Sequence, residues 1–223
     1  NLWYWMPQVR VTVERAGTVR FGVSGAVIAP MTGEPVGNFD TEHDAAERSR
    51  RPYREARARM RWGADDREGE VGVGVHKGWL SPVRDSLLSN DAITLDARIP
   101  FGPRVEVLAE AFSGRGMRVL GGGQAGQLYG VGGRVVRGVG GWGQVNVRHS
   151  SRLLFGAGYG FDDPKDGDIL ATGRRKNVTS ELHAIGHPGG PLVVSLEWRR
   201  TTTTYSTRSW TNDHFNLGLG FEF

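Results

Sequence analysis

The chain has 223 residues, 38% of them hydrophobic, with a formal net charge of +4, 34 glycines and no cysteine. The absence of thiols excludes disulfides, thiolate metal sites and cysteine nucleophiles, and it suits an oxidising compartment. The chain contains no run of eighteen apolar residues, so no transmembrane helix is predicted. The basic balance permits nucleic-acid binding, but basic patches interleaved with stacking aromatics are not obvious, so we predict no nucleic-acid partner.

Segments in which apolar and polar residues alternate strictly follow one another along the whole chain. A period of two is typical of a β-strand with one apolar face. In chain order, the predicted strands span residues 7–14, 18–25, 54–62, 70–79, 92–100, 104–112, 142–149, 152–161, 177–186, 191–200 and 214–223. We therefore predict an all-β protein with about 11–12 strands, organised as a single domain over residues 1–223.

The connectors between these strands are alternately short and long. Short connectors are expected at residues 14–18, 64–69, 101–104, 149–152 and 187–190, and long ones at 29–52, 81–91, 114–141, 162–177 and 204–214. This alternation is typical of an up-and-down antiparallel β-barrel that crosses an outer membrane, with tight turns at one end and long loops at the other. In hydrocarbon, every backbone polar group must be bonded within the protein, which leaves closed barrels and helices as the spanning structures.

A soluble β-sandwich or a lipocalin-like barrel would show the same alternation of residues. In those folds the apolar face points inward, and a small barrel cannot enclose the apolar side chains of eleven strands. The transmembrane reading, with the apolar face toward lipid, is therefore preferred. Aromatic belts are then expected at both strand ends, formed by Tyr53, Trp79, Trp142, Tyr159 and Phe161 on the loop side and by Trp62 and Phe223 on the turn side.

The final segment, HFNLGLGFEF, places five large apolar residues on one face. A closed barrel requires this strand to pair on both edges, and bacterial single-chain barrels have an even number of strands. Because about eleven strands are visible, we expect at least one more strand before them. The chain would then be part of a larger barrel whose N-terminal part lies outside residues 1–223.

The same final strand resembles the terminal strand of outer-membrane β-barrel proteins, which implies that Phe221 and Phe223 act as an assembly signal. The segments GGWGQVNVRHSSRLLFGAGYGFDDPKDGDI, GRRKNVTSELHAI and LVVSLEWRRTTTTY resemble the trimeric diffusion porins of the DcaP type, as do PQVRVTVERAGTVRFGVSGAVIAP and VEVLAEAFSGRG. The resemblance implies a porin of the Gram-negative outer membrane, in contact with outer-membrane lipid and lipopolysaccharide, in a homotrimer or a larger membrane complex.

The polar phase of the strands would line the lumen of such a barrel. An arginine-lined, water-filled channel favours small anionic solutes such as carboxylates, and three arginines on alternate positions of one strand repel one another unless anions lie opposite. The alternative is that arginine–glutamate pairs brace or plug the barrel wall. The predicted pore-lining residues are Arg10, Arg57, Arg59, Arg61, Arg98, Arg148, Arg199, Glu106, Glu110 and Glu197, with Arg20, Glu14, Asp96 and Glu181 on the same phase.

Other motifs have weaker functional readings. The sequence GGGQAG at 121–126 lacks the strand–helix context of a dinucleotide site, and we interpret it as a flexible loop that folds into the pore as a constriction. The four acids of DDPKDGD at 162–168 suit either a calcium site or, as we prefer, a solvated loop. His149, Glu181, His183 and His187 are interpreted as lumenal or turn residues rather than as a zinc or acid–base site.

Three function classes follow from these observations. The preferred class is a passive porin without cofactor, metal or catalytic residue. The second is a structural outer-membrane barrel that anchors or sheathes a partner, and the third is a barrel enzyme that modifies lipid. For the third class, Ser180 and Ser195 are candidate nucleophiles with a histidine as base, but no nucleophile motif supports them.

Overall fold

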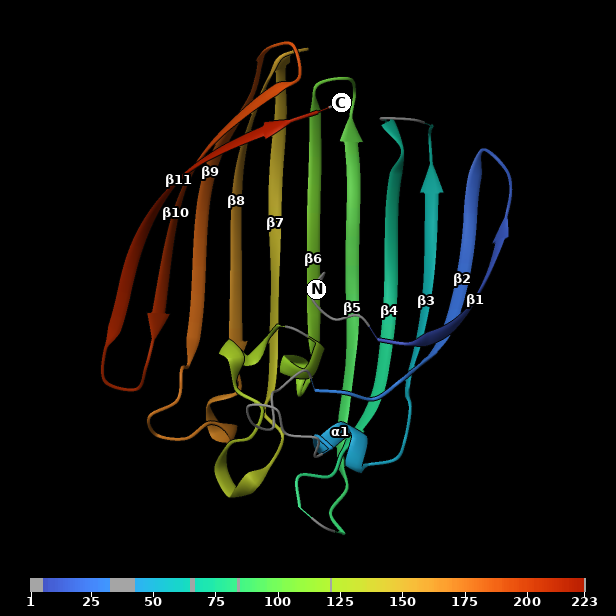
Figure 1. Ribbon diagram of the computed structural model, residues 1–223, viewed down its shortest axis with the longest axis vertical. Coiled ribbons are helices and arrows are strands. Elements are labelled where there is room, and N and C mark those ends of the chain that lie inside the picture. Colours follow the sequence, from blue (N-terminus) through green and yellow to red (C-terminus); the bar gives the residue numbers. More distant parts are fainter. Residues whose placement is uncertain (1–5, 33–42, 65–66, 84, 121, 223) are drawn as a thin grey trace.

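The computed structural model of the chain describes residues 6–32, 43–64, 67–83, 85–120 and 122–222. Within these residues, eleven strands form one antiparallel sheet in which sequence neighbours are spatial neighbours (Figure 1). This confirms the predicted all-β, up-and-down architecture. The strands are β1 (Gln8–Arg15), β2 (Val19–Ile28), β3 (Tyr53–Trp62), β4 (Gly69–Leu80), β5 (Leu88–Phe101), β6 (Val105–Arg115), β7 (Arg137–Ser150), β8 (Leu153–Pro164), β9 (Lys176–Gly189), β10 (Leu192–Thr204) and β11 (Ser209–Phe221).

The sheet is strongly curved, and β1 and β11 are its two edges (Figure 1). In the described part of the chain, β1 pairs with β2 alone and β11 pairs with β10 alone. The expectation that the last strand pairs on both of its edges is therefore not met here. Phe221 lies opposite Leu192 on the outer face, and Phe223 lies outside the described residues.

Tight turns join the strands at one end of the sheet, as predicted, and longer segments join them at the other end (Figure 1). The last of the long loops was predicted wrongly, because β10 continues to Thr204 and β11 already begins at Ser209. Residues 201–204 pair in register with residues 209–212. The β-branched threonines of this stretch favour the pleated conformation. The paired part of the sheet therefore continues to residues 204 and 209, where a loop over 204–214 was expected.

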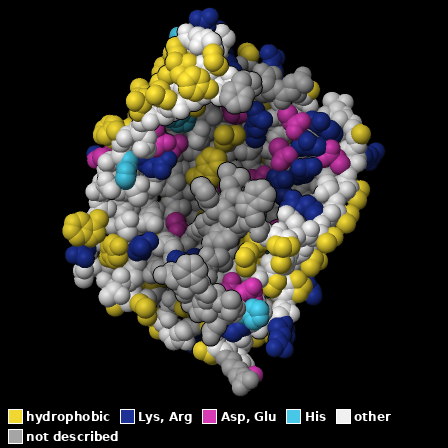
Figure 2. Space-filling view, in the orientation of Figure 1, with side chains coloured by type: hydrophobic (Ala, Val, Ile, Leu, Met, Phe, Trp, Pro, Cys, Tyr) yellow, Lys and Arg dark blue, Asp and Glu magenta, His cyan; other side chains and the backbone are white. Residues whose placement is uncertain are grey.

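The register places the predicted apolar and polar phases on opposite faces of the sheet. Large apolar side chains on the outer face are exposed, for example Leu95 at 55% and Val145 at 43%. Charged side chains gather in the hollow on the other face, while apolar side chains follow the outer margin (Figure 2). This arrangement is the reverse of a soluble β-barrel, whose apolar face lies inside.

Two aromatic residues lie on the face opposite to the one expected for an interface belt. Tyr53 shares the inner phase with Arg57; its side chain is fully buried, and its hydroxyl donates to the Met31 carbonyl at 3.0 Å. Trp142 also lies on the inner face, where its Nε1 donates to Glu110 Oε2 at 3.1 Å. The register leaves Trp79, Tyr159, Phe161 and Trp62 on the outer face, as the belt requires.

A small apolar core fills the inner side of the sheet at the loop end. The short helix α1 (Ala45–Arg48) closes part of this core, and it forms because Asp44 caps it, accepting from the backbone N–H groups of Ala46 and Glu47. The helix is tied to the end of β4, where Ser81 N–H donates to the Ala45 carbonyl. The core residues are Ala26, Ile28, Ala46, Tyr53, Leu80, Val119, Leu128 and Val135.

Candidate functional site

The alternating phase of β3 places three arginines on the inner face, where the sequence predicts them, and each of them contacts carboxylates. Arg57 Nη2 lies 2.7 Å from Glu70 Oε1 and also binds Asp96, and Arg59 Nη2 lies 3.1 Å from Glu14 Oε2. The side chains of these ion pairs are only 20–33% exposed. The repulsion expected within the arginine row is therefore relieved by acids of the neighbouring strands.

The third arginine of the row extends the network toward the turns. Arg61 binds Glu14 and lies 3.2 Å from Glu68 Oε1, while Arg20 Nη2 lies 2.6 Å from Glu68 Oε2. The network thus joins β1 through β5 across five strands. Its four arginines are matched by four carboxylates, which leaves this part of the wall without net charge.

The remaining predicted lining residues also lie on the inner face by register. Arg98 Nε is 2.5 Å from Glu106 Oε2, and Arg199 Nη2 is 2.9 Å from Glu197 Oε1. Arg10 donates to Gln8 Oε1 at 3.2 Å. Arg148 lies near the turn end of β7. Glu110 accepts a hydrogen bond from the indole N–H of Trp142. The structure therefore brings the predicted residues onto one wall, but most of the arginines there are paired.

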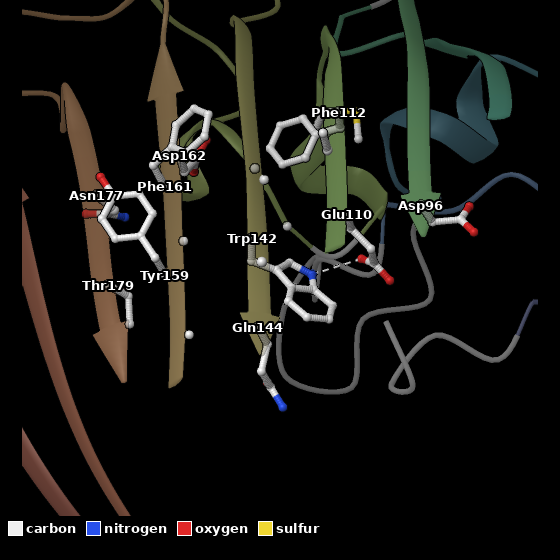
Figure 3. Close-up of a pocket in the computed structure, with 18 of the residues that line it drawn as sticks. Asp96, Glu110, Phe112, Trp142, Gln144, Tyr159, Phe161, Asp162, Asn177 and Thr179 are labelled. Carbon is white, nitrogen blue, oxygen red and sulfur yellow. Dashed lines mark hydrogen bonds between the residues drawn. The ribbon is translucent and has the colours of Figure 1, made fainter. Parts of the chain in front are cut away.

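A cavity of about 1130 Å³ occupies the inner side of the sheet between β5 and β10 (Figure 3). Glycines on the inner phase of β7 and β8 make room for larger neighbours: a Cβ on Gly140 would lie 2.4 Å from the Phe112 ring, and one on Gly158 would lie 2.8 Å from Glu181. The polar side chains around the cavity are Thr94, Asp96, Glu110, Gln144, Asp162, Asn177, Thr179, Glu181, Arg199 and Thr201.

The segment between β6 and β7, which we call the inner loop (116–136), reaches the loop end of this cavity. Asp162, on the inner phase of β8, accepts from Ala125 N–H, and Gln124 Oε1 accepts from Met117 N–H at 2.6 Å. From the next loop, Arg174 donates to the Ala125 carbonyl at 3.0 Å. These bonds fix residues 122–126 against the wall at the loop end of the cavity. That the loop forms a constriction stays a prediction, and residue 121 lies outside the described residues.

Sequence reasoning did not identify several residues of the cavity. Phe112 and Trp142 lie on its wall, and Gln144 and Thr179 complete its polar lining (Figure 3). The phase of the strands could have found all four. Trp142 and Gln144 lie an even number of positions from Arg148, Phe112 lies two positions from Glu110, and Thr179 lies two positions from Glu181. The phase does not explain why an aromatic side chain points inward at position 112. Its ring lies close to Gly140 of β7 and Gly123 of the inner loop, which a single sequence does not display.

The acids of residues 162–168 do not converge on one point. Asp163 pairs with Lys176 at 3.2 Å, Asp166 pairs with Arg175 at 2.8 Å, and Asp168 pairs with Arg137 at 2.6 Å. Asp162 instead accepts a hydrogen bond from the Ala125 N–H of the inner loop. Over the described ranges, no group of three or more histidines and acids is arranged to hold a metal ion.

Among the described residues, neither candidate serine is hydrogen-bonded to a histidine. Ser195 and His183 lie on the inner phase, whereas Ser180 lies on the outer phase. His183 Nδ1 is 3.7 Å from Glu181 Oε1, and His187 Nδ1 is 3.6 Å from Glu222 Oε2 at the turn end. The geometry thus places these histidines beside acids rather than beside a serine nucleophile.

These features define a class of fold, the wall of an outer-membrane-type antiparallel β-barrel. In the described residues, no helix is sufficiently long and apolar to span a bilayer. The chain superposes on the crystal structure of the outer membrane channel DcaP of Acinetobacter baumannii with a TM-score of 0.74 and 16% sequence identity. The match covers 98% of this chain and 62% of that one, so the chain spans less than two thirds of the length of the channel. No family model and no curated protein matches the sequence.

Proposed function

We propose that the chain forms part of the wall of an outer-membrane channel through which small polar solutes diffuse passively. The observation that carries the proposal is the cavity of about 1130 Å³ with its polar lining, on the inner side of a sheet whose outer face is apolar. A wall of this kind separates water from lipid. The likeness in fold to an outer membrane channel supports the same conclusion.

Within the described residues, β1 and β11 are open edges of the sheet, which adds a condition to this proposal. Backbone N–H and C=O groups along an open sheet edge cannot face hydrocarbon without partners. We therefore propose that further strands complete the wall, in keeping with the predicted larger barrel. Assembly into a homotrimer stays a prediction.

The finer proposal is a preference for anions, which rests on the inner arginines. Carboxylates neutralise the arginines of β2 and β3, so the preference has to come from Arg10, Arg148 and Arg199, and Arg199 itself lies beside two glutamates. The acids Glu110 and Asp162 also border the cavity. We accordingly propose a weak anion preference and expect it to be sensitive to single charges.

Planar-bilayer recordings with a salt gradient test the channel and its selectivity together. Purified protein should give discrete current steps, and its reversal potential should report a small excess of anion current. The variant R57Q/R59Q/R61Q leaves Glu14, Glu70 and Asp96 without their arginines, so its reversal potential should shift toward cations. A suitable control is R54Q/R115Q/R200Q, which removes three arginines from the outer face and should leave the reversal potential unchanged.

Two results would contradict these proposals separately. Absence of any current from folded, membrane-inserted protein would exclude the channel. If R57Q/R59Q/R61Q conducts with an unchanged reversal potential, the channel proposal stands. The arginines of β3 would then not determine the ion selectivity.

A structural barrel with a closed lumen is the second candidate function. It is favoured by the apolar core and the inner loop, which together fill the loop end of the inner side. A barrel of this kind would brace or anchor a partner and would pass no ions, so the same recordings distinguish it from a channel.

A further inference from the structure

A row of charged residues crosses the outer face at the loop end of its apolar belt. The register places Arg54, Lys77, Asp91, Arg115 and Arg137 side by side on β3 to β7. Two positions nearer the turns, the outer face is apolar and exposed. The exposed apolar residues at that level are Val75, Ile93 and Val139.

Three of the cations on this face gather around one indole ring. The guanidinium carbons of Arg51 and Arg54 lie 5.5 Å and 5.6 Å from the centroid of Trp79, and Lys77 Nζ lies 5.8 Å from it. Each cation is attracted by the ring, but the cations repel one another. Arg54 and Lys77 are also direct cross-strand partners, an arrangement that is destabilising for like charges.

One carboxylate lies within this group. Asp91 is 3.2 Å from Lys77 Nζ and 3.0 Å from Arg115 Nε. Among the described residues, no carboxylate forms an ion pair with Arg51 or Arg54. We call Arg51, Arg54, Lys77 and Arg115 the cationic patch. It carries an excess of positive charge at the boundary of the apolar belt.

A groove of about 740 Å³ adjoins the patch on the outer face. Its loop end is bordered by the cations Arg115, Arg137 and Lys165 and by the acids Asp91, Asp163 and Asp166. Toward the turns its wall is formed by Ile93 and Val139. One end of the groove therefore carries charges of both signs and the other end is apolar. The excess of positive charge lies in the adjoining cationic patch, so the patch and the apolar end together match a lipid with an anionic head and an acyl chain.

We propose that the cationic patch binds phosphate groups of lipopolysaccharide, with an acyl chain along the apolar end of the groove. Arginine forks bind phosphate oxygens in a bidentate manner, and an anion between the cations would relieve their repulsion. In a barrel with long loops outside, the loop end of the belt faces the outer leaflet. The four cations of the patch, with Asp91 as the acid among them, fit a head that carries more than one phosphate. This inference rests on the proposed placement in the outer membrane, but it does not require conduction.

Native mass spectrometry of the full, delipidated protein in detergent tests the proposal with diphosphoryl lipid A, monophosphoryl lipid A and phosphatidylglycerol as probes. Diphosphoryl lipid A should bind most tightly. Near a charged lipid surface, each arginine is worth about a fivefold change in affinity. The variant R51Q/R54Q should therefore bind this lipid roughly 25-fold more weakly, and K77Q, made separately, about fivefold more weakly.

The matched control is R104Q/R152Q, which removes two arginines from the exposed turns at the other end of the sheet and should bind diphosphoryl lipid A as the parent does. Equal binding by the parent and R51Q/R54Q, with both folded, would overturn the proposal. Equal affinity for phosphatidylglycerol would overturn the assignment to lipopolysaccharide in favour of phospholipid. Bilayer recordings on the same samples report separately on conduction, so failure of one proposal is distinguishable from failure of the other.

Discussion

At the scale of single residues, Asp168 is an acid of the outer loops whose two carboxylate oxygens both have partners. Its two carboxylate oxygens accept from Nε and Nη2 of Arg137, at 2.7 Å and 2.6 Å, and one of them also accepts from the Arg137 backbone N–H at 3.1 Å. The side chain of Asp168 is only 6% exposed. This bidentate pair ties the loop between β8 and β9 to the start of β7.

The hydrogen bonds from Arg137 lower the pKa of Asp168 from its ordinary value of 3.8 to about 2. A pKa that is lower in the folded state stabilises the fold above pH 3.8, and this stabilisation is lost as the pH falls toward 2. We therefore expect D168N to be destabilised at neutral pH by about 1–3 kcal/mol and to lose less stability than the parent between pH 4 and pH 2. Urea unfolding followed by tryptophan fluorescence measures both effects.

The nearby Asp166 offers a matched control. It pairs with Arg175 at 2.8 Å, but its side chain is 70% exposed, and exposed pairs contribute little. D166N should therefore unfold like the parent at every pH. A D168N protein with the same pH profile as the parent would contradict the role given to the pair.

The inner arginines show that alternation predicts the face on which a residue lies but not the residues that it contacts. The period of two placed Arg57, Arg59 and Arg61 on one face, because their apolar neighbours must share the other. It did not identify their partners, since Glu14 and Asp96 reach them through strand registers that a single sequence does not display. The charge of the wall depends on those partners, which is why the proposed selectivity is weaker than the arginine row alone suggests.

At the scale of elements, the inner loop determines how far the cavity is closed at its loop end. Its attachment to β8 depends on Asp162, because Ala125 N–H donates to that carboxylate. Gln124 and Ala125 both have positive φ values, of 48° and 51°. Non-glycine residues rarely adopt this conformation, so the hydrogen bonds around them stabilise an otherwise unfavourable turn.

Replacing Asp162 should loosen the inner loop and widen the constriction that we predict there. In D162A the Ala125 N–H loses its acceptor, and we expect a higher single-channel conductance or frequent transitions between conductance levels. The matched control is D163A, one residue further on, which lies on the outer face and pairs with Lys176. Conductance that is identical in D162A and the parent would show that the inner loop is held by other contacts or does not narrow the path.

The elements themselves were predicted well in the middle of the chain and less well at strand ends. Apolar and polar residues alternate clearly where one face of the sheet is apolar and the other polar, so the eleven strands and the tight turns followed from the pattern. Beyond the belt the outer face is polar as well, and the pattern fades; the extension of β10 through Thr204 was missed for this reason. Tyr53 was assigned to the belt by its position near a strand end, although its phase is that of Arg57.

At the scale of the whole molecule, the function depends on which face of the sheet meets lipid. Val145 and Gln144 are neighbours in the middle of β7, and they point to opposite sides. Val145 is 43% exposed on the outer face, whereas Gln144 borders the cavity and donates to Asn146 at 2.8 Å. The pair therefore allows the same substitution to be compared on both faces at one depth.

We expect V145R and Q144R to differ strongly. An arginine on the lipid face near the midplane costs about 2–4 kcal/mol, because its charge leaves water for hydrocarbon. An arginine at position 144 stays in the water-filled interior, beside acids of the cavity wall. Folding of the full protein into lipid vesicles, measured by heat-dependent electrophoretic mobility and by urea titration, should be impaired in V145R and close to normal in Q144R. The opposite order would mean that the apolar face is the buried interior of a soluble fold, and the channel proposal would then have no membrane to cross.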